Sequence, residues 1–365
     1  MLIRRRTHIA LICFLALTQA VALISPVRAT PGSLTSLSDE DGELDSIVVT
    51  TLAFYADAFP EILFVALPSG DGWLTSFATF LALLGDRAQN LDYEHPAQLR
   101  KDLLYVTKAR VQAMLRAGES SSSLFRVAAD GSAPREYLCA MTVNPSGVAS
   151  DDEVATRHLL GIFQADAPRY AVPKNQRLDH RHHLEYVLDH EIFHCLDALY
   201  NRPIPMSSDE RTTAYFHFLN ENGADAFALA MHIKRYGQGS EYSGRLAHIR
   251  GLSLFWGDPG HFTYDSARRI LERENDDLTQ MSISDILSLA ASVRDRVAPT
   301  FGDFLEYELA ATEASRALED GFEPLCRNMH EQRDDSGLSI RDRLLLTSCT
   351  CYATVFRVSL SVSQD

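Results

Sequence analysis

The chain has 365 residues, of which 46% are hydrophobic and 23% charged, and its formal net charge is -15. This composition excludes a disordered polymer, a disulfide-stapled miniprotein and a multispan membrane protein, and the length allows a substantial hydrophobic core. The negative charge argues against a nucleic-acid-binding protein, because such proteins gain much of their affinity by neutralising phosphates.

Residues 1–29 have the pattern of a signal peptide. Three arginines at positions 4–6 precede an apolar run over 9–24, and Val27, Arg28 and Ala29 form a small-x-small cleavage site. The apolar run is shorter than the roughly 20 residues that span a bilayer, which disfavours the alternative of an uncleaved anchor helix. We therefore expect cleavage after Ala29, no remaining membrane anchor, and export to the periplasm or the extracellular medium.

The mature chain is expected to begin with a flexible segment over 30–45, rich in Gly, Ser and Asp, followed by one domain over 46–365. In chain order, the pattern predicts apolar segments over 46–66 and 73–84 with a turn over 68–72 between them, a helix over 99–115, a loop over 118–123 and a strand over 136–143.

The second half of the chain has a strongly helical pattern. The first predicted helix is capped near Asp179 and runs to Tyr200. The second begins at Ser207, Ser208 or Asp209 and ends at Tyr236, before a glycine. A Gly-rich passage over 257–261, a helix over 265–274 and further helices across 282–318 follow. The expected fold class is α+β, mostly helical, with a small β component near the middle of the chain.

Five cysteines remain after the leader is removed. Export permits disulfides, and Cys326 can pair with either Cys349 or Cys351. Because five is an odd number, at least one thiol is expected to stay free or to pair with another chain. Cys195 is interpreted as a core or disulfide residue.

The segment from His190 to His194 has the HExxH pattern of zinc hydrolases. On a helix, two histidines four residues apart lie about 40° apart around the axis and ~6 Å apart along it, so both can bind one ion. Glu191 lies near them, where its carboxylate can take a proton from a metal-bound water.

The second helix carries two carboxylates, Glu221 and Asp225, four residues apart on one face. A catalytic zinc needs a third protein ligand and an open position for water, and a neighbouring helix is well placed to supply that ligand. We predict that Glu221 is the third ligand. Asp225 is predicted to accept the other ring N–H of His190, a contact that metal-binding histidines usually make.

HExxH followed by ExxxD resembles the gluzincin, or thermolysin-like, clan of metallopeptidases. Over residues 190–225 the resemblance implies a zincin-like catalytic domain, with Zn²⁺ bound by His190, His194 and Glu221. It also implies Glu191 as the general base, Asp225 as the partner of a ligand, and a peptide or protein substrate. The gap between His194 and Glu221 is longer than in thermolysin itself, so the subfamily is not identified.

The same resemblance implies a histidine beyond the third ligand that stabilises the oxyanion formed during peptide hydrolysis. His261, in the Gly-rich passage, is the first candidate and Tyr264 the second. Their alternative role is to cap and pack the helix that follows.

Other histidines suggest simpler roles. His180, His182 and His183 are expected to form a solvated first turn of the HExxH helix. His217 lies four residues before Glu221 and is an alternative metal ligand, although that choice would forfeit the pair of carboxylates.

Two functions follow from these observations. The first is an exported zinc metallopeptidase, in which Glu191 moves the proton of a metal-activated water and the strand over 136–143 is an edge that pairs with extended substrate. The second is an exported zinc-binding or scaffold protein without turnover. The intact Glu191 favours the peptidase, because zinc binding alone does not require that carboxylate.

Overall fold

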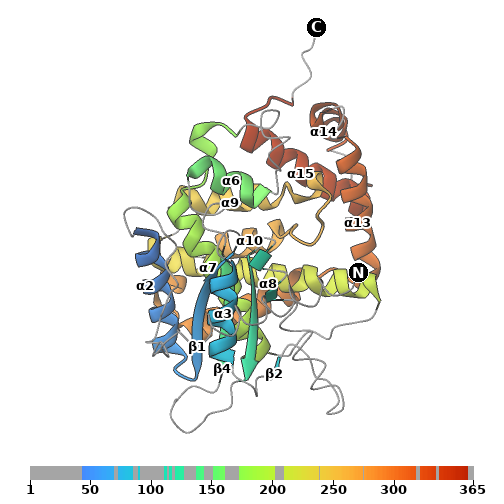
Figure 1. Ribbon diagram of the computed structural model, residues 1–365. Coiled ribbons are helices and arrows are strands. Elements are labelled where there is room, and N and C mark those ends of the chain that lie inside the picture. Colours follow the sequence, from blue (N-terminus) through green and yellow to red (C-terminus); the bar gives the residue numbers. More distant parts are fainter. Residues whose placement is uncertain are drawn as a thin grey trace, which may run out of the picture.

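The computed structural model describes residues 43–69, 73–84, 89–90, 111–112, 115–116, 120–126, 137–143, 151–160, 172–201, 209–237, 239–273, 275–317, 321–333 and 337–360 (Figure 1). The predicted signal peptide lies outside these residues, as does the predicted flexible segment except for 43–45, which are helical. The predicted helix over 99–115 also lies outside them, apart from residues 111, 112 and 115, which are helical.

The first half of the chain contributes the sheet and three helices. Its described elements are α2 (Glu43–Ala58), β1 (Ile62–Pro68), α3 (Trp73–Leu84), β2 (Gln89–Asn90), β3 (Ser121–Arg126), β4 (Tyr137–Val143) and α6 (Asp152–Leu160). Of these helices, α2 and α3 pack against the sheet, whereas α6 packs against α7 (His180–Tyr200) and α9 (Glu241–Arg250) of the second half.

The second half is helical, as predicted. It contains η2 (Lys174–Gln176), α7 (His180–Tyr200), α8 (Glu210–Tyr236), α9 (Glu241–Arg250), η3 (Ser253–Trp256), α10 (Tyr264–Leu271), α11 (Asn275–Gln280), α12 (Ile283–Val297), α13 (Phe301–Arg316), α14 (Phe322–Glu331) and α15 (Ile340–Phe356). A mostly helical chain with one small sheet confirms the α+β class.

The sheet has the order β1-β4-β3-β2 and mixed direction. β4 pairs in parallel with β1, Phe64 opposite Cys139, and antiparallel with β3, where Leu124 lies opposite Cys139. β4 is therefore an inner strand. The strand predicted over 136–143 is confirmed for its described residues, but the prediction that it forms an edge is wrong.

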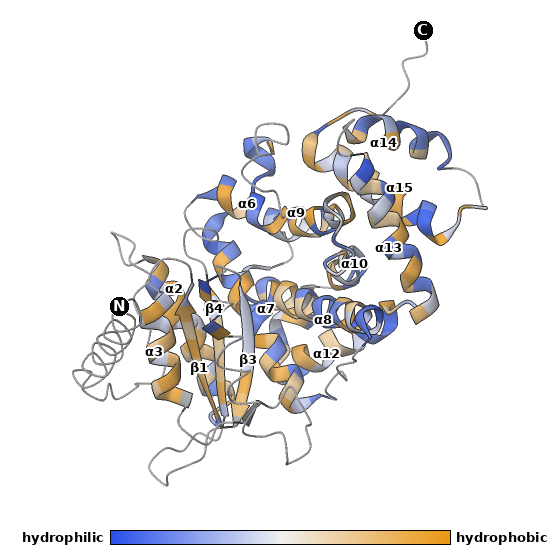
Figure 2. Cartoon of the chain, turned by 45° about the vertical axis from the view of Figure 1, so that its right-hand side comes forward, coloured by the Kyte–Doolittle hydropathy of each residue, from blue (hydrophilic) through white to orange (hydrophobic). Residues whose placement is uncertain are grey.

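Both faces of this sheet are buried, because side chains alternate along each strand. Phe64, Cys139 and Met141 belong to the core shared with α2, α7 and α8, whereas Val65 and Leu138 belong to a smaller cluster with Phe80 of α3. Figure 2 shows the apolar strands between α3 on one side and α7 on the other. The sheet thus supports one side of the HExxH helix.

The loop predicted over 118–123 is wrong in part, because Ser121, Ser122 and Ser123 form the first half of β3. Serine favours turns when it is judged locally. Here pairing with β4 satisfies the backbone hydrogen bonds, and the Ser122 hydroxyl donates to the backbone carbonyl of Glu191 over 2.7 Å. Tertiary pairing therefore overrides the local preference.

Local signals set the ends of the two long helices as predicted. The Asp179 carboxylate accepts hydrogen bonds from two backbone N–H groups of the first turn of α7, and the Asp209 carboxylate caps α8 by accepting from the backbone N–H of Thr212. Gly237 ends α8 with a φ of 79°, a left-handed conformation that glycine adopts without strain. Because these residues set where each helix begins and ends, they also set the direction in which each site residue points from its helix.

Two disulfides connect these elements. Cys139–Cys195 joins β4 to α7, one residue after His194, and Cys326–Cys349 joins α14 to α15. The second pairing is one of the two predicted alternatives, and Cys351 is a buried free thiol. None of the helices in the described ranges is long and apolar enough to cross a membrane.

The histidines that begin α7 differ in burial. His180 is partly exposed beside Asp152, but His183 is fully buried against Tyr242 of α9 and His158 of α6. The predicted solvated cluster is therefore wrong for His183, because α6 and α9 pack over the first turn of α7. Burial, together with the positive Arg250, lowers the pKa of His158 to about 4.

The burial of His158 predicts that the folded protein loses stability in acid. The native pKa of His158 lies below its unfolded value of 6.5, so protonation favours the unfolded chain. The stabilising contribution is complete above pH 6.5 and is lost as the pH falls toward 4. In urea unfolding of metal-free protein, His158→Gln should reduce the stability difference between pH 7 and pH 4.5 by about 2 kcal/mol.

His330→Gln, at the surface of α14, is the matched control and should leave that difference unchanged. An identical pH dependence in His158→Gln and wild type would contradict the assignment.

Candidate metal centre

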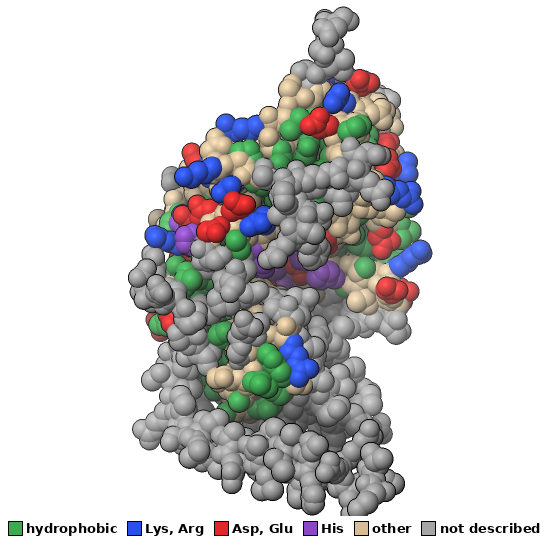
Figure 3. Space-filling view, turned by 45° about the horizontal axis from the view of Figure 1, so that its top comes forward, with side chains coloured by type: hydrophobic (Ala, Val, Ile, Leu, Met, Phe, Trp, Pro, Cys, Tyr) green, Lys and Arg blue, Asp and Glu red, His purple; other side chains and the backbone are tan. Residues whose placement is uncertain are grey.

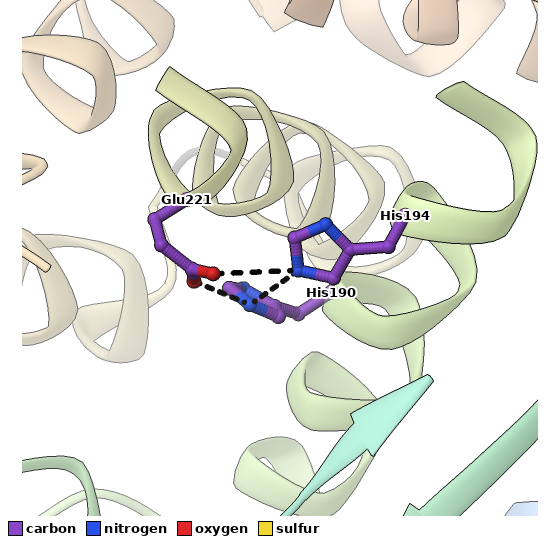
Figure 4. Close-up of side chains that lie close together, drawn as sticks. All are labelled: His190, His194 and Glu221. Atoms are coloured by element: carbon purple, nitrogen blue, oxygen red, sulfur yellow. Dashed lines mark hydrogen bonds and ion pairs between the residues drawn. The ribbon is translucent and has the colours of Figure 1, made fainter. Parts of the chain in front are cut away.

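His190, His194 and Glu221 meet between α7 and α8 (Figure 4). The Nε2 atoms of the two histidines lie 3.3 Å apart. The Glu221 carboxylate approaches them with Oε2 3.0 Å from His190 Nε2 and Oε1 3.6 Å from His194 Nε2. The sequence therefore predicted which three side chains the fold brings together.

These distances fit a tetrahedral ion. With zinc–ligand bonds of about 2.0–2.1 Å, tetrahedral ligand atoms lie about 3.3 Å apart. The two Nε2 atoms lie 3.3 Å apart, and each lies close to a different oxygen of the Glu221 carboxylate, at 3.0 Å for His190 and 3.6 Å for His194. In addition, the buried Glu221 Oε2 makes no hydrogen bond of good geometry with the described residues, although Nε2 of His190 lies 3.0 Å away and Nε2 of His261 3.3 Å away. The donor set and geometry thus fit a divalent metal that accepts nitrogen and oxygen ligands.

The two histidines have opposite protonation preferences in the metal-free protein. Burial lowers the pKa of His190, but the Glu221 and Asp225 carboxylates outweigh it and raise the pKa to about 10. Burial also lowers the pKa of His194, in this case to about 4, so this ring is neutral and ready to bind. A metal cation would replace the proton that His190 holds against Glu221.

Asp225 fixes the orientation of His190. Its Oδ1 lies 2.8 Å from Nδ1 of His190, so the opposite ring nitrogen, Nε2, is directed toward Glu221. Arg250 of α9 binds both carboxylate oxygens of Asp225, at 2.7 and 2.9 Å. The hydroxyl groups of Tyr186 and Thr263 also donate to Asp225. Asp225 thus lies where the sequence predicted, at the centre of a larger buried network.

Three members of that network were missed by sequence reasoning: Arg250, Tyr186 and Thr263. Arg250 and Thr263 follow Asp225 by 25 and 38 residues, and no spacing rule connects them to it. Tyr186 lies four residues before His190 on the same helix face, and this was the one available signal.

Glu191 is buried next to the three ligands. Its Oε2 has no hydrogen-bond partner among the described side chains. Burial, reinforced by the negative Glu221 and opposed by His190, raises the pKa of its carboxyl group to about 7. A carboxyl group with such a pKa can both accept and release a proton near neutral pH.

The two candidate oxyanion donors have different surroundings. His261 lies at the centre, with Nε2 3.3 Å from Glu221 Oε2 and Nδ1 2.6 Å from Asp258 Oδ2. Tyr264 is packed elsewhere. Its ring lies 6.3 Å from the His248 ring, and its Cδ2 would lie 3.2 Å from a Cβ placed on Gly251. No described contact joins Tyr264 to the three ligands, which favours a packing role for it.

The centre is open to solvent on one side. The side chains of His194, His217 and His261 keep 23%, 51% and 31% of their surface exposed, whereas Glu221 keeps 7%. Figure 3 shows histidine side chains gathered along a hollow across the middle of this face. A ligand can therefore reach the exposed side of the centre.

Comparisons with known proteins identify no relative. No protein-family model matches the chain, and no curated protein and no solved structure matches it significantly.

Asp225→Asn tests how far this network controls metal binding. The variant keeps the shape of the side chain but removes the charge that orients His190, so zinc affinity should fall about 10–100-fold. Competition with a chromophoric chelator measures that affinity.

Asp197→Asn provides the control. Like Asp225, Asp197 of α7 is a buried carboxylate that is paired with an arginine, in this case Arg294 of α12, at 2.8 Å. The substitution should lower the stability but not the zinc affinity. Equal zinc affinities of Asp225→Asn and wild type would remove the orienting role.

Proposed function

We propose that this chain is an exported zinc-dependent metallopeptidase that hydrolyses peptide bonds with Glu191 as the general base. The observation that carries the proposal is the convergence of two imidazole nitrogens, 3.3 Å apart, and the Glu221 carboxylate beside the buried carboxyl group of Glu191, whose Oε2 has no hydrogen-bond partner among the described residues. Zinc binding alone would not need that carboxylate.

His190, His194 and Glu221 would hold the metal. When bound, zinc supplies Lewis acidity, which polarises the scissile carbonyl and lowers the pKa of a water molecule to about 7. The network around Asp225 keeps the His190 ring in the orientation that binding requires. The chain itself therefore supplies three metal ligands in fixed positions between α7 and α8, at a point that solvent can reach.

Glu191 moves the proton in this mechanism. Its carboxylate accepts a proton from the attacking water and delivers the proton to the leaving nitrogen of the peptide. A pKa near 7 suits both halves of this transfer. Its burial also limits competing contacts with solvent.

His261 is the proposed donor to the oxyanion. Burial lowers its pKa, but Glu221 and Asp258 raise it to about 9, so the ring carries a proton on each nitrogen near neutral pH. The Asp258 carboxylate holds Nδ1 and directs Nε2 toward the centre. A charged N–H donor in this position favours the developing negative charge of the transition state.

β3, and not β4, is the proposed site for extended substrate. β2 pairs with β3 only at Phe125 and Arg126, and no described strand covers Ser122–Leu124 on that side. The Ser122 hydroxyl binds the backbone of Glu191, so this part of the edge lies next to the base. Backbone pairing there would align a peptide with the centre.

The predicted signal peptide and the disulfides support export. Disulfides persist in the oxidising periplasm or extracellular space, and the described part of the chain has two, one of them attached to the HExxH helix.

Glu191→Gln separates catalysis from metal binding. The amide keeps the size and polarity of the side chain, so the fold and the zinc content should survive. Because the amide cannot accept the water proton, turnover of a mixed peptide library should fall by at least ~10²-fold.

Glu185→Gln is the matched control, on the same helix but bound to Tyr236 at the surface, and it should retain wild-type turnover. Peptide cleavage by Glu191→Gln at the wild-type rate would refute the mechanism. Zinc-loaded wild type that cleaves no peptide would instead favour a non-catalytic zinc-binding or scaffold protein.

A further inference from the structure

Glu221 faces a second pair of histidines on the open side of the centre. His217 Nδ1 lies 3.3 Å from Glu221 Oε1, and His261 Nε2 lies 3.3 Å from Oε2. These three donor atoms all lie within 4.8 Å of one another. Their separations from the carboxylate resemble those of the first group.

His261 is held as metal-binding histidines are. Its Nδ1 lies 2.6 Å from Asp258 Oδ2, and its backbone N–H donates to Asp258 Oδ1 over 3.3 Å. This pair of contacts fixes the ring and leaves Nε2 for another partner. A carboxylate on the far nitrogen is the usual support of a ligating imidazole.

Gly260 allows His217 and His261 to converge. A Cβ at position 260 would lie 2.9 Å from Cδ2 of His217 and 3.3 Å from its Nε2, so a larger residue would push the loop away from α8. With glycine, the two imidazole rings approach to 5.4 Å between centroids and are nearly perpendicular.

The Glu221 carboxylate can serve both groups. Each of its oxygens faces one histidine of each pair: Oε1 faces His194 and His217, and Oε2 faces His190 and His261. A carboxylate has about four lone-pair sites on its two oxygens, so it can bridge two cations. The second pair is the more exposed one, which predicts weaker binding.

We propose that His217, His261 and the shared Glu221 form a second, weaker site for a divalent transition metal that accepts imidazole ligands, with Zn²⁺ as the probe. The site goes beyond the proposed peptidase function, because it requires neither turnover nor an ion at His190 and His194. An ion bound at this second site would replace the proton on Nε2 of His261, so this histidine could not donate to the oxyanion while the second site is occupied. His217, which the sequence suggested as an alternative ligand of the first ion, is here a ligand of the second.

Zinc stoichiometry tests the proposal. Metal-free protein is titrated with Zn²⁺ against a chromophoric chelator, using wild type, His217→Gln, His194→Gln and the surface control His330→Gln. Wild type and His330→Gln should bind two equivalents, one more weakly. His217→Gln should lose the weaker equivalent and keep the tighter one with unchanged affinity.

The variants also separate this proposal from the first centre. If wild type binds one ion that His217→Gln loses and His194→Gln keeps, the second site stands and the first centre fails. If wild type binds one ion that His217→Gln keeps, with equal or reduced affinity, the second site is refuted. Two equivalents of unchanged affinity in His217→Gln would refute it as well.

Discussion

The arrangement of the site depends on the contacts that the buried carboxylate of Asp225 makes. Its partners come from α7 (Tyr186 and His190), from the end of α9 (Arg250) and from the residue before α10 (Thr263). A buried carboxylate without partners would be strongly destabilising, so these segments must be in place together. Satisfying one charge therefore fixes the orientation of α7 relative to α8, and with it the position of His190.

Helical geometry transmits this constraint to the metal ligands. Glu221 lies one turn before Asp225, and His194 one turn after His190, so the same helix faces that meet at Asp225 also meet at the proposed centre. The Cys139–Cys195 disulfide and the Ser122 hydroxyl then attach the opposite side of α7 to the sheet. The proposed general base, Glu191, thus belongs to a helix held on both sides, as a preorganised site requires.

Contacts between residues a few positions apart were predictable from the sequence. The meeting of α7 and α8 at His190, Glu221 and Asp225 was predictable as well, because a known motif implies it, but the other contacts between distant segments were not. The caps at Asp179 and Asp209 and the ligand pairs on α7 and α8 follow from helical periodicity. Arg250 was not predictable, because its partner lies on another helix and basic residues are common on helix surfaces. β3 was missed for a related reason: its serines favour a turn until β4 pairs with them. The burial of His183 likewise depends on α6 and α9, which no local pattern brings together.

We infer that His190, His194 and Glu221 bind zinc at one position between α7 and α8. Anomalous diffraction at the zinc absorption edge, from crystals of the protein grown with zinc, locates the ion directly. We expect a strong anomalous peak at about 2.0–2.2 Å from Nε2 of both histidines and from a Glu221 carboxylate oxygen. Zinc-soaked crystals with these three side chains ordered and no anomalous peak between them would contradict it.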